Sequence, residues 1–308
     1  MWERWHTSLI WETNPQCSNP TLSFRRQTCL KQWQNSSKNV SGKVSKMGIA
    51  EIYDFYWNQN VDPRTIVLPL MESPILIPTI LASYLYFVLK CGPRYMKDKK
   101  PYDLRTFVKY YNIFQIVSNA LIVQQFLSAG VLTEFSVICT LPNYTFDPKH
   151  VKIAYMFWWT LLLKLVDLIE TGVFVLRKRD RQISFLHIYH HISTVIIVWT
   201  FGRYVPVAMA SFSIIVNCII HVIMYTYYYF STMGDKAPKI LKKIKPLITI
   251  MQMAQFVLLI SQNIMSFLPS CPVARLPGIV SIINLVINFK LFYDFYQKTY
   301  KKTNEKSM

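Results

Sequence analysis

The chain has 308 residues, of which 52% are hydrophobic and 15% aromatic, with a formal net charge of +18 and a mean hydropathy of +0.22. This combination argues against an ordinary soluble domain, because apolar runs of about 20 residues alternate with Lys/Arg clusters. The basic residues fall in the loops between those runs, which argues against nucleic-acid binding, and the six cysteines contain no CxxC pair that would indicate a zinc site.

The chain begins with a polar segment, residues 1–46, that contains four Trp and lacks the apolar core of a secretory signal peptide. We expect a disordered N-terminal extension there, and Met47 offers an alternative start. Seven apolar spans follow, which predict an all-α membrane protein with a seven-span domain over 47–298 and a basic cytosolic tail over 299–308. The expected spans are roughly 74–91, 107–130, 152–176, 184–202, 205–230, 246–267 and 277–297.

Charge in the loops predicts the orientation of these spans. Nineteen Lys and Arg residues fall in the tail and in the loops on one side, whereas the alternate loops contain four. The positive-inside rule then places the N-terminus outside the cytosol and the C-terminus within it. Three glycosylation sequons, at Asn35, Asn39 and Asn143, fall on the non-cytosolic side. Cys139 and Cys271 fall there too, where an oxidising lumen permits a disulfide, but sequence does not give their separation.

Three histidines, His187, His190 and His191, lie near the start of the apolar span 184–202. Ionisable side chains at membrane depth are costly, by about 2.5–3.5 kcal/mol for the charged types, so they are a functional-site hypothesis by default. At about 100° per residue, a helix presents all three imidazoles on one face. The span therefore predicts a site that uses several imidazoles together.

Other spans place polar residues at a similar depth, roughly 5–14 Å from their expected cytosolic ends at 1.5 Å per residue. Because unrelated polar residues would scatter over the membrane, this convergence predicts a shared cavity that opens to the cytosol. Lys164 and Asp167 share a helix face, and an internal ion pair between them is one interpretation. The polar residues at this level are Asn112, Gln115, Asn119, Asp167, Glu170, His221, Gln252 and Gln255.

Two kinds of chemistry suit such a histidine cluster. The HxxHH spacing occurs in membrane di-iron oxygenases and desaturases, and imidazole is a suitable iron ligand. With His6 and His150 on the luminal side, however, four histidines remain near the site, fewer than a histidine-box desaturase needs. The alternative is covalent catalysis, because neutral imidazole attacks thioesters and forms a reactive acyl-imidazole. A receptor or transporter is a third hypothesis, but it gives no reason for this off-centre polar layer.

Four motifs in consistent order resemble the fatty acid elongase (ELO) family, the membrane-embedded condensing enzymes of very-long-chain fatty acid synthesis. The family's KxxExxDT motif corresponds to residues 164–171, QxxFLHxxHH to 182–191, HxxMYxYY to 221–228 and TxxQxxQ to 249–255. The similarity extends over roughly 49–300. The first motif departs from the pattern, since the chain has Asp167 and then Glu170 where the family has Glu and then Asp.

The resemblance implies seven transmembrane helices, of which helices two to seven form a six-helix barrel around an acyl tunnel. It also implies that a long-chain acyl-CoA and malonyl-CoA react by ping-pong through an acyl-histidine to give 3-oxoacyl-CoA, CoA and CO2, without a metal or other cofactor. His190 would be the nucleophile and His221 would assist condensation, with His187 and His191 in support. The further supporting residues would be Lys164, Asp167, Glu170, Gln182, Asn217, Tyr225, Gln252 and Gln255.

The same resemblance implies a multi-pass protein of the endoplasmic reticulum membrane with a luminal N-terminus and a cytosolic C-terminus. Its partners would be the two CoA substrates, membrane lipid, a second copy of the chain and the other enzymes of the elongation cycle, with no nucleic acid. The basic loops would attract the CoA phosphates. The length and saturation of the acyl chain depend on the end wall of the tunnel, which sequence does not reveal.

Overall fold

A computed structural model describes residues 48, 61–135, 137–139, 145–234, 238, 240–268, 271 and 275–301 of the chain. The expected extension over 1–46, the three sequons and all but the start of the tail over 299–308 lie outside these residues. The described residues form helices, turns and loops and contain no strand, which confirms the all-α prediction for this part of the chain.

Long helices coincide with all seven expected spans, with their ends displaced by a few residues. The first is continuous from α4 through a π-helical segment, η2, into α5. Helix α10 begins at Leu241, so Pro246 lies inside the helix rather than at its expected start. The bounds are α4 Leu76–Tyr86, η2 Phe87–Cys91, α5 Gly92–Met96, α6 Arg105–Ser128, α7 Pro148–Leu176, α8 Phe185–Tyr204, α9 Ala208–Ser231, α10 Leu241–Ile264 and α11 Arg275–Tyr296.

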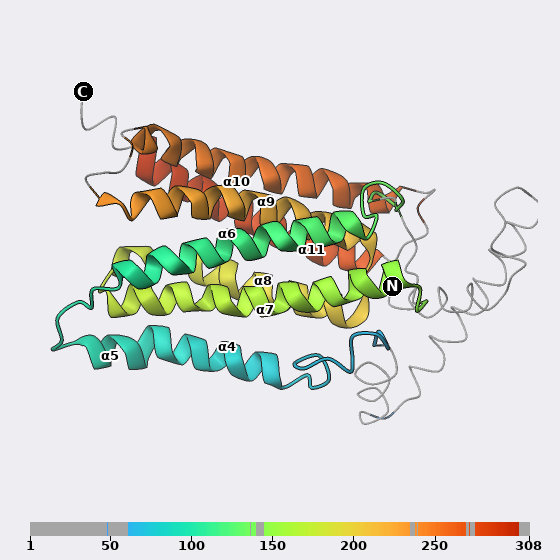
Figure 1. Cartoon of the computed structure of the whole chain (residues 1–308), viewed down its shortest axis with the longest axis horizontal. Helices are drawn as coiled ribbons and strands as arrows, with labels where there is room; N and C mark the ends of the chain where they lie inside the picture. Colours follow the sequence, from blue (N-terminus) through green and yellow to red (C-terminus); the bar gives the residue numbers. More distant parts are fainter. Residues whose placement is uncertain are drawn as a thin grey trace, which may run out of the picture.

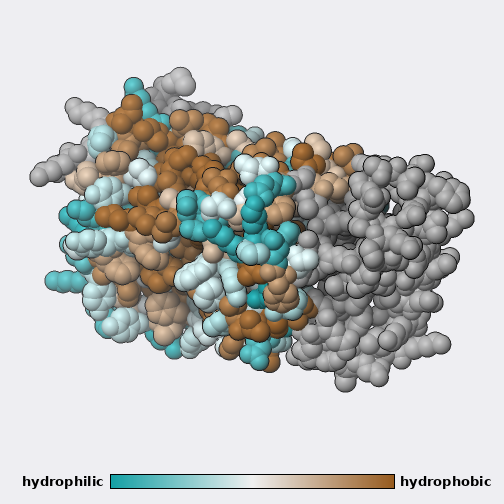
Figure 2. Space-filling model, turned by 45° about the vertical axis from the view of Figure 1, so that its right-hand side comes forward, coloured by the Kyte–Doolittle hydropathy of each residue, from teal (hydrophilic) through white to brown (hydrophobic). Residues whose placement is uncertain are grey.

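The surface of the bundle is that of a multi-pass membrane protein. Four helical stretches in the described residues are long and apolar enough to cross a membrane: Leu76–Met96, Ala208–Ser231, Lys243–Phe267 and Arg275–Tyr300. The other long helices, α6, α7 and α8, carry buried polar side chains, among them Asn112, Lys164 and His191. Figure 2 shows hydrophobic residues over much of the flank, with hydrophilic residues at the left-hand end and in a patch near the middle of the view.

The long helices run side by side, and successive helices are antiparallel (Figure 1). The helix α6 packs against α7 and α9, α9 against α10, α10 against α11, α11 against α8, and α8 against α7. The segment formed by η2 and α5 packs on α7. We call the end where α7 finishes and α8 begins the histidine end, and the opposite end the disulfide end.

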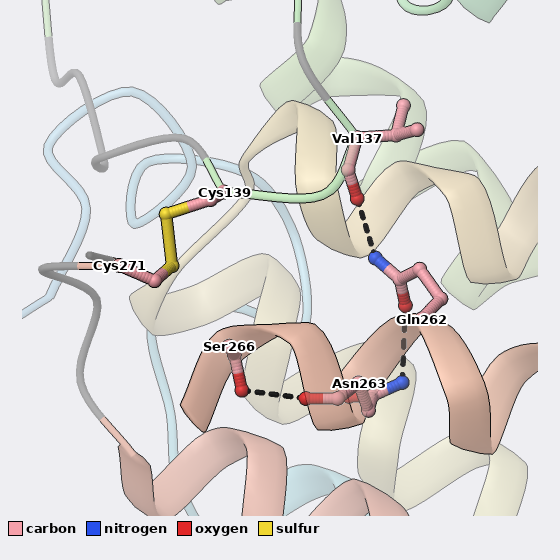
Figure 3. Close-up of a disulfide and its surroundings, with 6 residues drawn as sticks. All are labelled: Val137, Cys139, Gln262, Asn263, Ser266 and Cys271. Carbon is pink, nitrogen blue, oxygen red and sulfur yellow. Dashed lines mark hydrogen bonds between the residues drawn. A yellow bond between two sulfur atoms is a disulfide. The ribbon is translucent and has the colours of Figure 1, made fainter. Parts of the chain in front are cut away.

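The disulfide end is cross-linked. Cys139 and Cys271 form the disulfide that the sequence left open, with their Cα atoms 5.7 Å apart (Figure 3). Beside it, the amide of Gln262 on α10 donates to the backbone oxygen of Val137 at 2.6 Å and to that of Met209 at 3.2 Å. These bonds connect α10 to the loop that follows α6 and to the first turn of α9, so the helices are held together at this end by covalent and polar links.

Candidate active site

The turn between α7 and α8 brings the two helices together. Lys178 adopts a left-handed conformation with φ 51°. Its N–H bonds to Val175, and the N–H of Arg179 bonds to Phe174 at 2.8 Å, so the last carbonyls of α7 are satisfied in a Schellman motif. Ser184 then caps α8, because its Oγ accepts from the backbone N–H of His187 at 3.2 Å. This cap places His187 in the first turn of α8, against the last turns of α7.

Lys164 and Asp167 form the expected internal ion pair on α7. The Lys164 Nζ lies 3.2 Å from Asp167 Oδ2, and both side chains are buried. The other carboxylate oxygen, Oδ1, accepts a hydrogen bond of 2.7 Å from Gln115 on α6. Both oxygens of Asp167 are therefore occupied by partners within the bundle.

The imidazoles of α8 face α7 and one another. His187 Nε2 lies 2.8 Å from the hydroxyl of Thr171, which in turn lies 2.9 Å from the hydroxyl of Tyr84 on α4. The ring centroids of His187 and His191 are 4.2 Å apart, and His191 Nε2 is 4.0 Å from an oxygen of Glu170. Glu170, unlike Asp167, is directed at the histidines.

His190 points to a different helix. Its Nδ1 lies 3.1 Å from Oδ1 of Asn288 on α11, and its ring makes an edge contact with Phe292. Asn288 is bonded in turn to Asn284, one turn earlier on α11. Tyr189, the neighbour of His190, donates to Asn284 at 3.2 Å. Two polar links thus join α8 to α11 at the nucleophile that the sequence predicted.

Helices α9 and α10 contribute the remaining predicted residues. His221 and Tyr225 on α9 are buried with their rings 5.7 Å apart, and Gln252 on α10 donates to the sulfur of Met224 at 3.4 Å. Within the described part of the chain, several buried polar atoms in this region have no hydrogen-bond partner. They include His221 Nδ1, Gln255 Oε1, Asn112 Nδ2 and Asn119 Oδ1.

An unpaired buried polar atom costs about 1–3 kcal/mol, so a group of them is expected where a polar ligand or water completes the bonding. These four atoms come from α6, α9 and α10. Asn112 Nδ2 can donate to a carbonyl or carboxylate of a substrate, whereas Gln255 Oε1 and Asn119 Oδ1 can accept from an amide N–H. The region is thus suited to binding a polar group between the helices.

Two predicted supporting residues stand apart from this cluster. Gln182 lies in the short turn η3, Asp180–Gln182, with an exposed side chain at the histidine end. Asn217 is partly buried on α9, one turn before His221, and so is on the same side of that helix. The structure brings together the other predicted residues on α7 and α8, and places those of α9 and α10 in the same helix bundle.

The sequence reasoning missed Asn284 and Asn288. Both are polar residues four positions apart inside an apolar span, the signal that had drawn attention to Asn112, Gln115 and Asn119 on another span. Asn288 is 1% exposed and in direct contact with His190, so it belongs to the site.

Glu170, His187 and His191 are also close enough to share a metal ion. Their potential ligand atoms all lie within 4.8 Å of one another. Imidazole and carboxylate donors suit zinc or iron, although His187 Nε2 is already engaged with Thr171. The cluster has the donor set for three ligands of such a site.

Comparison with known proteins decides the family. The model of the GNS1/SUR4 (ELO) family matches residues 69–308, more than three quarters of the chain. The chain belongs to the ELO family. All four motifs that carry the polar site lie within the matched region.

Curated ELO relatives share about a third of their residues with this chain. The human "Very long chain fatty acid elongase 1" is 38% identical over 250 residues, which cover 79% of this chain and 88% of the relative. The mouse protein of the same name is 37% identical over the same coverage. The Drosophila melanogaster "Very long chain fatty acid elongase 7" is 34% identical, covering 80% of this chain and 74% of the relative.

Proposed function

We propose that this ELO protein is a condensing enzyme of fatty acid elongation that lengthens a long-chain acyl-CoA by two carbons. The observation that carries the proposal is the buried polar cluster built from the four ELO motifs around His187, His190 and His191. The names of its relatives support the same activity, since they are very long chain fatty acid elongases. Saturated, monounsaturated and polyunsaturated chains are all candidate substrates.

The proposed reaction has two half-reactions. In the first, His190 attacks the thioester carbonyl of the acyl-CoA, so that a C–N bond forms, the C–S bond breaks and CoA leaves. In the second, malonyl-CoA loses CO2, and the carbanion formed attacks the acyl carbon to give 3-oxoacyl-CoA and free His190. His221, with its unpaired Nδ1, would hold the malonyl thioester oxygen as charge develops on it.

The helix contacts support a six-helix barrel for the acyl chain. The packing order α6, α9, α10, α11, α8, α7 and back to α6 closes a ring, with the segment from α4 to α5 outside it. We propose that the acyl chain lies within this ring, with its thioester at the histidine end. The cross-links at the disulfide end would close the far end of the tunnel.

We further propose the endoplasmic reticulum membrane as the location, with the histidine end towards the cytosol. The disulfide supports the orientation, because disulfides form in oxidising compartments and this one lies at the end predicted to be luminal. The loops at the histidine end carry most of the Lys and Arg, as the positive-inside rule requires for the cytosol. Membrane lipid, a second copy and other elongation-cycle enzymes would be its partners there.

The decisive experiment incubates the purified protein with a long-chain acyl-CoA alone and then examines peptides by mass spectrometry. We expect the acyl mass on the peptide that contains His190, with release of one CoA for each acyl group. His190→Ala should abolish both the adduct and the condensation product. Lys109→Ala, at an exposed position on α6, should affect neither. Release of CoA without an acyl-protein adduct would rule out the ping-pong mechanism.

The cluster of Glu170, His187 and His191 favours one alternative, a metal-dependent lipid hydroxylase or desaturase. Metal analysis of active protein distinguishes the two functions. We expect condensing activity to survive dialysis against EDTA, with no stoichiometric metal bound. Stoichiometric iron, together with loss of activity on its removal, would favour the alternative instead.

A further inference from the structure

The amide of Asn288 has only one orientation that satisfies its neighbours. Its Nδ2 donates to the backbone oxygen of Asn284 at 2.9 Å and to the side-chain Oδ1 of Asn284 at 3.2 Å. Turning the amide over would set its oxygen against these two acceptors, which is unfavourable. The atom that faces His190 is therefore an oxygen, and it can only accept a hydrogen bond.

Asn284 is itself held from the side of α8. The hydroxyl of Tyr189 donates to the Oδ1 of Asn284, which also accepts from Asn288. Because Tyr189 and His190 are adjacent on α8, and Asn284 and Asn288 are one turn apart on α11, the four side chains form a single chain of hydrogen bonds. Asn288 is 1% exposed, so water does not compete for its oxygen.

An acceptor opposite Nδ1 determines which tautomer His190 adopts. A neutral imidazole carries one proton, and a fixed acceptor 3.1 Å from Nδ1 keeps that proton on Nδ1. The lone pair available for attack is then on Nε2. The opposite tautomer would set a lone pair of Nδ1 against the oxygen of Asn288 and would leave Nε2 protonated and unable to attack.

We propose that Asn288 is a positioning residue that holds His190 in the Nδ1-protonated tautomer, so that Nε2 receives the acyl group. The inference rests on the proposed function and deepens it. When Nε2 attacks, the C–S bond breaks and CoA leaves as a thiolate, which takes a proton from water. The Nδ1 proton stays in place, so the intermediate is an acyl-imidazolium whose positive charge the oxygen of Asn288 stabilises. Attack by the malonyl-derived carbanion then breaks the C–N bond and returns neutral His190.

The test compares three variants in the first half-reaction, with a long-chain acyl-CoA and no malonyl-CoA. Asn288→Leu keeps the approximate shape but removes the acceptor. We expect it to slow acyl transfer roughly tenfold or more while acyl-CoA affinity stays within about twofold. Asn288→Asp restores an acceptor at the same place, because its carboxyl in the protonated form donates its O–H to Asn284 as the amide did. Acyl transfer should then return to within about threefold of wild type. Asn263→Leu, also a buried asparagine but at the disulfide end, should lower thermal stability without slowing acyl transfer.

A wild-type rate for Asn288→Leu, or an Asn288→Asp variant no faster than Asn288→Leu, would overturn the inference. If Asn288→Leu fails to fold, Asn288→Ser replaces it, since a serine hydroxyl is too short to reach Nδ1, and the same two outcomes apply. Failure of the proposed function is seen separately, because wild-type protein would then form no acyl-His190 adduct at all.

Discussion

The amide of Gln115 on α6 donates to the carboxylate of Asp167 on α7, with 2.7 Å between Nε2 and Oδ1. Since Lys164 lies at the other oxygen, both carboxylate oxygens of Asp167 have partners on α6 and α7. Glu170 lies instead beside His191. The two acidic residues of the motif therefore differ in role: the first fixes α6 to α7, and the second faces the imidazoles. Their exchanged order in this chain puts the shorter side chain at the structural position.

The buried pair of Lys164 and Asp167 predicts a large effect on stability. Asp167→Ala leaves the Lys164 ammonium buried without its counter-charge, so we expect a loss of about 3–5 kcal/mol. Asp294→Ala breaks the exposed pair with Lys290 and should change stability by less than about 0.5 kcal/mol. Thermal unfolding of both variants in the same detergent gives the comparison. Equal shifts in Tm would show that the buried pair contributes no more to stability than the exposed pair.

The assignment of His221 to condensation predicts separable half-reactions. His221→Ala leaves His190 and its Asn288 partner in place, so the acyl-protein adduct should still form from acyl-CoA. Condensation should be slowed roughly 100-fold or more, because a group that stabilises developing negative charge is missing. Mass spectrometry of the adduct, followed by addition of malonyl-CoA and measurement of 3-oxoacyl-CoA, separates the two steps. A variant that forms no adduct would instead place His221 in the first step.

We expect loss of the disulfide to lower the stability of the protein without lowering its activity. Cys139 and Cys271 are 132 residues apart in sequence, and the chain-entropy model assigns a bond over such a loop about 4–5 kcal/mol. Cys139→Ser should therefore lower the Tm clearly, while the rate at low temperature stays near that of wild type because the histidines lie at the other end. Cys91→Ser, at an exposed free cysteine, is the matched control and should not change the Tm. Loss of activity in folded Cys139→Ser protein would contradict the separation of the two ends.

The Asp147 cap at the start of α7 should make the stability of the protein depend on pH. The backbone N–H of Lys149 donates to its carboxylate and holds the pKa of Asp147 below its usual range. Because the folded pKa is depressed, the cap contributes stability above the unfolded pKa and loses it as pH falls through the folded value. The wild-type Tm should therefore fall on acidification relative to that of Asp147→Asn, whose amide caps without titrating. Parallel curves for the two proteins between pH 7 and pH 3 would refute this.

Local patterns predicted the helices, and they picked out the polar residues that the structure brings together on α7 and α8. The spans and the HxxHH face depend on hydropathy and helical spacing, which neighbouring residues determine. The contact between His190 and Asn288 was not foreseen, because it depends on α11 lying against α8, and these helices are 98 positions apart at that contact. Gln182 shows the converse: it belongs to a recognisable motif, but it falls in the turn before α8, where its side chain is exposed.

The disulfide has a topological consequence. Together with the main chain from Cys139 to Cys271, it closes a covalent loop that contains α7, α8, α9 and α10. If the peptide were cut once between α9 and α10, the two fragments would stay joined through sulfur. They would run as one band on a gel without reductant and separate only after reduction. A protease site inserted there would thus report which side of the membrane the histidine end faces, from sealed vesicles and a single gel.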